Sequence, residues 1–331
     1  MFIRFFKSSF FSQYLAIALT GLGLWVMAFL KPPAMPAPFG PVPLYKLAYD
    51  LLADHRLAAT MIAFFVVMAE TYWLSRILSD HELVLKNSSL SALVFIVMAS
   101  SIPEQLTLTP INIALGFMIL IIYHLLISYN KPEHLDRIFA AGFFTAVASM
   151  FYLPFILWFV FVIISFLVFR AGNWRAWMAA FLGLITPFLY LAVYYFWNDQ
   201  LLENSASFPA FFRQFTIFPQ NTGSGFRVIS GFTLLIAIWG IVRFRRGPQK
   251  TVEIRVKTNI LLWTIVFTII SFLFSGPVAI FHAALALPAL AMLITGALLN
   301  LRRTRPAEIL LLCYFLVILI NNLFLHDLAY L

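Results

Sequence analysis

Residues 111–128 read INIALGFMILIIYHLLIS, a stretch without a single Asp, Glu, Lys or Arg. The hydrocarbon slab of a bilayer is about 30 Å thick, and a helix needs about 20 mostly apolar residues to cross it. Other apolar runs along the chain approach this length. Together the runs are 14–30, 57–74, 90–102, 111–128, 138–152, 155–169, 177–197, 228–242, 260–274, 278–299 and 309–325. The sequence therefore predicts an all-α, polytopic transmembrane helix bundle of about 11 spans.

The composition supports this fold class over the alternatives. Of the 331 residues 63% are hydrophobic and 11% are charged, whereas about a quarter of a soluble chain is charged. A chain of this size cannot bury so much apolar surface in water. The lone Cys313 excludes a disulfide scaffold, and the composition excludes a disordered chain or a cytosolic enzyme. We expect residues 1–331 to form one transmembrane domain.

The distribution of Lys and Arg predicts the orientation. Cytoplasmic loops of membrane proteins retain positive charge. With the amino terminus inside, seventeen of the 22 basic residues fall in cytoplasmic segments. We expect a multi-pass protein of the bacterial inner membrane with its amino terminus inside and its carboxyl terminus outside. The net charge of +9 then reflects insertion and attraction to anionic lipid, so the partner is the bilayer and not nucleic acid.

Three polar segments stand out between the runs. Extracytoplasmic residues 31–56 open with six prolines and continue into a stretch whose leucines recur at helical spacing, which predicts a short helix lying in the membrane interface. Residues 198–227 form an aromatic extracytoplasmic loop. Residues 243–259 form a basic cytoplasmic loop.

Asp50 and Asp54 are the candidate catalytic residues of the first extracytoplasmic segment. On a helix their spacing places them on one face, beside His55 and Arg56. A carboxylate near an apolar surface has a raised proton affinity and can act as a general base. The alternative is a solvated polar face in which Asp54 caps the next helix.

Further candidates lie in later outer segments. Glu104 follows Pro103 in a short outer loop, where it either takes part in catalysis or stabilises a helix start. Arg213 and Arg227 could bind phosphate oxygens bidentately, or they could anchor the chain to lipid headgroups.

Ionisable residues within the apolar runs include Glu70 and His282. Glu70 lies toward the cytoplasmic end of its run, where we expect it to reach water or pair with Arg76. His282 is a candidate substrate-binding residue near an outer helix end, although a single histidine in a bundle more often packs with a hydrogen bond. No metal-ligand spacing or nucleotide-binding motif occurs, so we expect no bound cofactor and no metal-ligating residues, while the use of a divalent metal ion stays open.

The organisation of about the first two hundred residues, down to the stretch from Ser89 to Arg170, resembles the GT-C glycosyltransferases of the dolichyl-phosphate-mannose protein mannosyltransferase type. The similar features are an acidic first outer loop with an interfacial helix, the apolar helix that ends at Tyr129-Asn-Lys-Pro132, and the small-residue run from Phe139 to Pro154. The chain also resembles an uncharacterised family of bacterial polytopic membrane proteins, through the start at Phe5–Phe11 and the Asn173-Trp-Arg175 step. The separation of Asp50 from Asp54 departs from the adjacent acidic pair usual in GT-C enzymes.

The resemblance implies sugar transfer from a polyprenyl-phosphate donor on the extracytoplasmic face. In that scheme Asp50 or Asp54 is the base, Glu104 orients the substrate, and Arg213 and Arg227 hold the donor phosphate. His55 and His282 are further substrate-binding candidates. One rival hypothesis is a non-catalytic membrane component of an envelope assembly or secretion machine. Another is a transporter, which needs polar midplane residues and broken helices.

Overall fold

The structure is a computed structural model, and it describes residues 5–84, 87–129, 134–169, 173–201, 251–272, 282–299, 301 and 305–324. Within these ranges the regular structure is entirely helical, without a strand, as the sequence predicts. In chain order the helices are α2 (Phe11–Leu30), α3 (Pro43–Leu52), α4 (Arg56–Asp80), α5 (Leu90–Ala99), η1 (Pro103–Leu106), α6 (Pro110–Ser128), α7 (Leu135–Phe151), η2 (Leu153–Leu157), α8 (Trp158–Val168), α9 (Trp174–Trp197), α12 (Val252–Phe272), η4 (Ala283–Ala286), α14 (Leu287–Leu299) and α15 (Arg305–Phe324).

Five of these helices are long and apolar enough to cross a membrane: α2, α4, α6, α9 and α12. Shorter apolar helices stand beside them. Ten of the expected runs coincide with described helices, while residues 228–242 lie outside the described residues. The membrane class of the protein is therefore supported by helix length and composition, and the count of about 11 stays a prediction.

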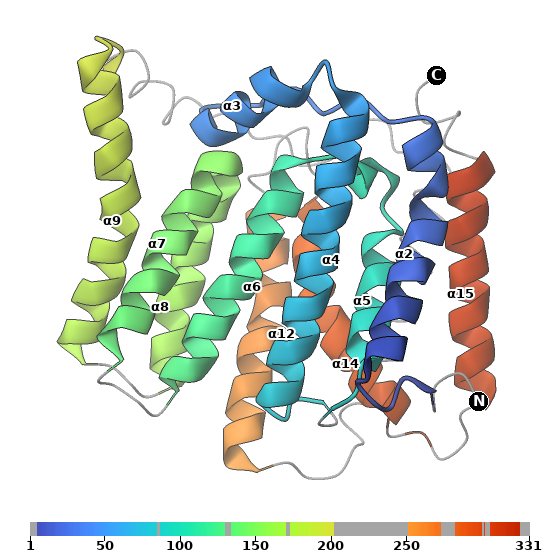
Figure 1. Ribbon diagram of the computed structural model, residues 1–331. Coiled ribbons are helices and arrows are strands. Elements are labelled where there is room, and N and C mark those ends of the chain that lie inside the picture. Colours follow the sequence, from blue (N-terminus) through green and yellow to red (C-terminus); the bar gives the residue numbers. More distant parts are fainter. Residues whose placement is uncertain are drawn as a thin grey trace.

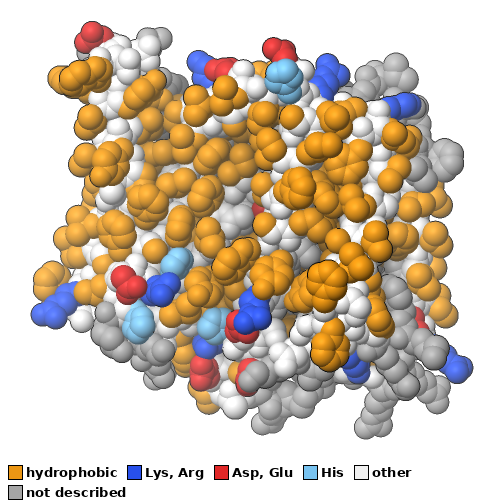
Figure 2. Space-filling view, viewed as in Figure 1, with side chains coloured by type: hydrophobic (Ala, Val, Ile, Leu, Met, Phe, Trp, Pro, Cys, Tyr) orange, Lys and Arg blue, Asp and Glu red, His pale blue; other side chains and the backbone are white. Residues whose placement is uncertain are grey.

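The helices stand side by side as a bundle, with α3 lying across one end (Figure 1). We call this end, which also holds η1, the α3 end. We call the opposite end the His81 end, because His81 there meets the first turns of α12. Hydrophobic side chains cover most of the visible face, while charged and histidine side chains gather along its two edges (Figure 2). This is the pattern expected where lipid surrounds the middle of a bundle.

The short helices α5 and α14 lie inside the bundle. All ten residues of α5 are buried, and α5 packs against both α4 and α14. The run 90–102 is too short to span a bilayer as one helix, and the structure shows why: α5 ends at Ala99, and the chain turns into η1. This segment is a broken helix within the bundle.

Two glycines bring α7 and α9 together. A Cβ placed on Gly142 would collide with the carbonyl oxygen of Ala180, and one placed on Gly183 would collide with that of Phe139. Small residues at such crossings let helix backbones approach closely inside a membrane. The α7–α9 pair is consequently the most extensive helix contact in the described structure.

The structure tests the predictions for the three polar segments to different extents. Residues 31–42 are irregular, and α3 follows them, so the proline-rich opening and the short helix are both present as predicted. Residues 252–259, expected within a basic loop, form the first turns of α12 instead. Residues 243–250 and 202–227 lie outside the described residues.

Candidate functional site

Tyr45 fixes α3 across the end of the bundle. Its side chain is fully buried, and its hydroxyl lies 2.8 Å from the carbonyl oxygen of Pro36 and 3.3 Å from that of Leu108. Burial, and secondarily Tyr49, raises the pKa of Tyr45 above its usual value, so the hydroxyl stays a neutral donor. One residue of α3 thus ties the helix to the proline segment before it and to the segment that follows η1.

Asp50, Asp54 and His55 all lie at the α3 end, and all three are exposed. Asp50 is in the last turn of α3, and Asp54 follows in the turn that leads to α4. His55 occupies the N-cap position of α4 and makes no side-chain capping bond, so Asp54 does not cap this helix. Among the described residues, neither carboxylate has a hydrogen bond or ion pair. The structure places these candidates on one surface without forming a closed site.

The other candidates are placed less completely. Glu104 is in η1 at the same end of the bundle, but its side chain is outside the described structure, as are Arg213 and Arg227 altogether.

A cavity of about 20 Å³ beneath α3 is bounded by Tyr45 and Tyr152 among others. This volume holds about one water molecule, so it is too small for a sugar. Any sugar site built on Asp50 and Asp54 would have to use the exposed surface.

His282 lies in a hydrogen-bond network inside the bundle. The ring is fully buried, with Nδ1 2.7 Å from the Tyr152 hydroxyl. Its Nε2 is 3.1 Å from the carbonyl oxygen of Thr268 and 2.8 Å from Ser271 Oγ. A carbonyl only accepts, so Nε2 carries the hydrogen and Nδ1 accepts from Tyr152. Ser271 in turn donates to the carbonyl of Phe267 (2.6 Å), so His282 does not act on it as a base.

The network connects segments far apart in the sequence. Tyr152 follows α7, Thr268 and Ser271 belong to α12, and His282 precedes η4. Every polar atom of the imidazole is satisfied inside the bundle, which is the condition for burying it at little cost. This arrangement agrees with the packing alternative for His282, and its role in substrate binding stays a prediction.

A second polar cluster surrounds the break after α5. Trp25 donates to Ser100 Oγ (3.0 Å), and Asn322 donates to the carbonyl oxygens of Leu24 (3.3 Å) and Ser100 (3.1 Å). Asn112 donates to the carbonyls of Gln105 and Thr107 on the far side of η1. The bonds of Asn322 to Ser100 and of Asn112 to Gln105 and Thr107 satisfy backbone carbonyls that the broken helix leaves free. The sequence analysis did not predict these hydrogen bonds. The only sequence signal near them is Thr109-Pro110, which is typical of a helix start.

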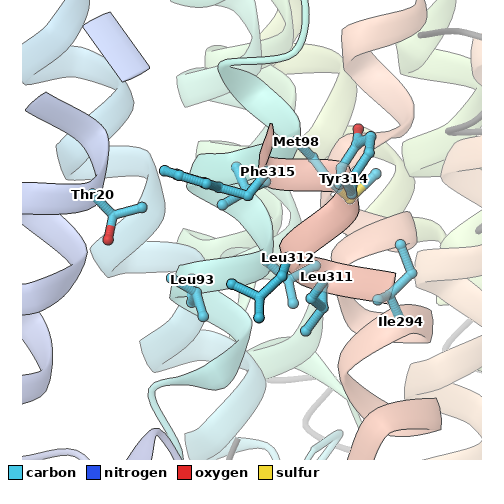
Figure 3. Close-up of a pocket in the computed structure, with 10 residues that line it drawn as sticks. Thr20, Leu93, Met98, Ile294, Leu311, Leu312, Tyr314 and Phe315 are labelled. Carbon is cyan, nitrogen blue, oxygen red and sulfur yellow. The ribbon is translucent and has the colours of Figure 1, made fainter. Parts of the chain in front are cut away.

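An apolar cavity of about 150 Å³ lies between α2, α5, α14 and α15 (Figure 3). In Figure 3, Phe315 of α15 extends toward Thr20 of α2, with Leu93, Leu311 and Leu312 nearby. The complete lining is Thr20, Leu93, Val94, Val97, Met98, Ile294, Leu311, Leu312, Tyr314 and Phe315. The lining of α5 and α14 is buried, whereas Leu312 is 48% exposed and Thr20, Leu311 and Phe315 are half-buried. The cavity thus has a closed inner wall and an open side between α2 and α15.

The cavity sits at the middle depth of the bundle. At 1.5 Å per residue, Thr20 is about 14 Å from one end of α2 and about 15 Å from the other. The sequence did not predict this cavity, because its walls come from four helices whose residues are distant in the chain.

A charged cluster lies at the His81 end. Lys257 is 7% exposed, and its Nζ donates to Glu253 (2.6 Å) and to His81 Nδ1 (3.3 Å). The same ammonium lies 5.6 Å from the ring centroid of Tyr129. Burial, and then the charge of Lys257, lowers the pKa of His81 to about 4. The cluster joins the ends of α4 and α6 to α12. The ammonium group of Lys257 contacts Glu253, His81 and the ring of Tyr129.

The described residues contain no group of three His, Cys, Asp or Glu side chains that could hold a metal ion.

Comparisons with known proteins give one family. The model of a family of unknown function, DUF6427, matches residues 45–329, which is most of the chain. No curated protein and no solved structure matches the chain.

Proposed function

Because the chain belongs to the DUF6427 family, whose function is unknown, we propose a function from geometry: the protein binds the hydrocarbon chain of a membrane lipid inside its helix bundle. We also propose that it resides in the bacterial inner membrane with its amino terminus inside, as the charge distribution indicates.

The apolar cavity carries this proposal. An apolar cavity of similar size in a protein core stays dry and accepts benzene, so a short stretch of hydrocarbon fits. The open side lies between α2 and α15 at mid-depth, where the surrounding solvent is lipid tails.

Sugar transfer is the second candidate, and one observation favours it. Asp50 and Asp54 are exposed on α3 and on the turn after it, where they would meet an acceptor hydroxyl at the membrane surface. The donor would be a polyprenyl-phosphate-linked sugar, whose isoprenoid chain matches the chemistry of the cavity. Glu104, Arg213 and Arg227 would orient the substrate and its phosphate, with His55 beside them. A non-catalytic envelope component with the same lipid site is the remaining alternative.

Photocrosslinking of the native protein tests lipid binding directly. The protein is reconstituted with a phospholipid that carries a diazirine midway along one acyl chain. Crosslinks on α5 and on the cavity face of α15 support the proposal. Crosslinks confined to residues outside the cavity, such as the exposed face of α9, overturn it.

A matched pair of variants gives a second test. Val97→Phe fills the buried wall of the cavity, whereas Val193→Phe makes the same change at a side chain that is 54% exposed on α9. We expect the first variant to lose the crosslinks on α5 and α15 and the second to keep them. Equal crosslinking by folded protein of both variants contradicts a lipid chain in the cavity.

The enzyme hypothesis needs its own experiment. Purified protein is incubated with a polyprenyl-phosphate-linked sugar and a hydroxyl-bearing acceptor, and the glycosylated acceptor and the released polyprenyl phosphate are both measured. Transfer that is lost in an Asp50→Asn, Asp54→Asn double variant supports catalysis at the α3 end. If the protein binds the lipid but does not consume the donor, it is a lipid-binding protein without catalytic activity.

A further inference from the structure

Glu70 is an ionisable residue at the middle depth of the bundle. It belongs to α4, and at 1.5 Å per residue it lies about 21 Å from Arg56 and about 15 Å from Asp80. The hydrocarbon slab extends about 15 Å on each side of its centre. Glu70 therefore falls well inside the apolar zone if α4 crosses the membrane.

The expected pairing of Glu70 with Arg76 is wrong. Arg76 forms its ion pair with Asp80 (3.1 Å), and both of those side chains are exposed. Six residues correspond to about one and two-thirds helical turns, so the side chains of Glu70 and Arg76 leave α4 in different directions. Nor does Glu70 reach water at an interface, because it is only 4% exposed.

The carboxyl group has no polar partner among the described residues. Both Oε1 and Oε2 are buried and without a hydrogen bond. The described ion pairs join Arg76 to Asp80, Arg137 to Asp136 and Lys257 to Glu253, and none includes Glu70. Most buried polar atoms of proteins are hydrogen-bonded, so an unpartnered carboxyl group demands an explanation.

Gly116 of α6 provides the space for this carboxyl group. A Cβ on Gly116 would lie 3.2 Å from Glu70 Oε1 and 3.9 Å from Glu70 Cγ. The carboxyl group thus lies between α4 and α6 against bare backbone. The adjacent Ala69 is exposed and Gly116 is half-buried, so the buried carboxyl group lies close to the outer surface of the bundle. One turn further on, Trp73 of α4 meets Tyr123 of α6 (6.4 Å between centroids).

Within the part of the chain that the structure describes, the titratable groups of the helices around α4 do not supply a counter-charge. Of the elements that pack against α4, α5 has no titratable side chain and α2 has only Tyr14. On α6, Tyr123 pairs with Trp73, and His124 stacks on Phe144 of α7. The charged residues of α3 and η1 belong to the α3 end.

We propose that Glu70 is a proton-binding site within the bilayer, buried between α4 and α6. An ionised carboxylate without a partner is very costly in an apolar medium, and binding one proton converts it to a neutral carboxyl group. A sodium ion is disfavoured as ligand, because it would need further oxygen atoms around Glu70. Release of the proton requires water or a counter-charge at the α4–α6 seam, so proton occupancy is coupled to the packing of these two helices.

This inference is independent of lipid binding, since the cavity has no lining residue from α4 or α6. It supplies the midplane ionisable group that a transporter needs.

A hydrophobic carbodiimide tests the proton on the native protein. A protonated carboxyl group adds its O–H across one C=N bond of dicyclohexylcarbodiimide, and the acyl group then moves to nitrogen, so the product gains the mass of one reagent molecule. We expect one stable adduct at neutral pH, located on Glu70 by peptide mass spectrometry. A water-soluble carbodiimide should not produce it.

Variants and salt complete the test. Glu70→Gln should abolish the adduct, while Glu82→Gln, at an exposed glutamate after α4, should keep it. Gly116→Ala crowds Oε1 and should slow labelling about fivefold, equivalent to about 1 kcal/mol. Its control is Gly23→Ala, where a Cβ would meet open space.

Absence of a Glu70 adduct in the native protein overturns the proposal. Protection by sodium chloride but not by choline chloride overturns it in favour of a sodium site.

Discussion

At the scale of single residues, buried polar atoms decide which substitutions this protein tolerates. The hydroxyl of Tyr152 and the imidazole of His282 lie 130 residues apart in the chain and 2.7 Å apart in space. An intact hydrogen bond between buried partners adds modestly to the stability of the fold. Removing one partner costs more, because the other stays buried without a hydrogen bond.

Tyr152→Phe should destabilise the protein by about 1–3 kcal/mol, because Nδ1 of His282 loses its donor. Thermal unfolding in detergent measures the change. Tyr190→Phe, at a tyrosine that is 70% exposed on α9, is the control and should leave the melting temperature unchanged. Equal melting temperatures for the Tyr152 variant and the native protein would show that this bond does not stabilise the bundle.

The glycines between α7 and α9 allow a second prediction. Gly142→Ala should cost about 1–3 kcal/mol or more, because the new Cβ meets the backbone of Ala180 and not a flexible side chain. Gly23→Ala, where the space is open, should be neutral or slightly stabilising. Unfolding of both variants in the same detergent provides the comparison. If they unfold alike, close α7–α9 packing is not the reason for glycine at position 142.

At the scale of elements, the break between α5 and α6 shows how the bundle satisfies irregular backbone. The last turn of α5 ends among polar residues, and Asn322 of α15 donates to the carbonyl of Ser100. Irregular backbone at membrane depth is tolerated only where protein or water satisfies its polar groups. Asn112 of α6 and Asn322 of α15 satisfy these groups around the break, and Trp25 of α2 donates to the Ser100 hydroxyl.

The contact between α4 and α12 at the His81 end predicts a dependence on pH. The pKa of His81 is lowered from 6.5 to about 4 by burial and by Lys257, against the opposing charges of Asp80 and Glu253. The unfolded chain therefore binds a proton at a higher pH than the folded protein does. The associated stability is complete above pH 6.5 and is lost as the pH falls from 6.5 toward about 4.

Melting temperatures across this pH window test the effect. His81→Gln keeps an acceptor for Lys257 but does not titrate, so its melting temperature should fall less steeply than that of the native protein. His55→Gln, at an exposed histidine, should retain the native slope. A native slope in the His81 variant would exclude His81 as the source of the acid sensitivity.

At the scale of the whole molecule, the two ends of the bundle should face different compartments. Asp54 and Asp80 are exposed near opposite ends of α4, and the charge distribution predicts that Asp54 lies outside. In a Cys313→Ser background, Asp54→Cys should react with a membrane-impermeant thiol reagent in intact cells. Asp80→Cys should react only after permeabilisation. The reverse pattern would invert the proposed orientation.

The sequence by itself determined the class of the protein and the positions of most helices. Long apolar runs must satisfy their backbone internally in lipid, so residues such as 111–128 form a helix whatever surrounds them. Local spacing also predicted α3 in the segment 31–56, because its leucines recur with the helical period.

Only the tertiary structure decided what the helices present to one another. The sequence contains Glu70, yet its isolation depends on the rotation of α4 and on the bare backbone of Gly116. The partners of His282 and the walls of the apolar cavity likewise come from separate helices. Local periodicity fixes where a helix forms, whereas depth, rotation and neighbours follow from packing among residues far apart in the chain.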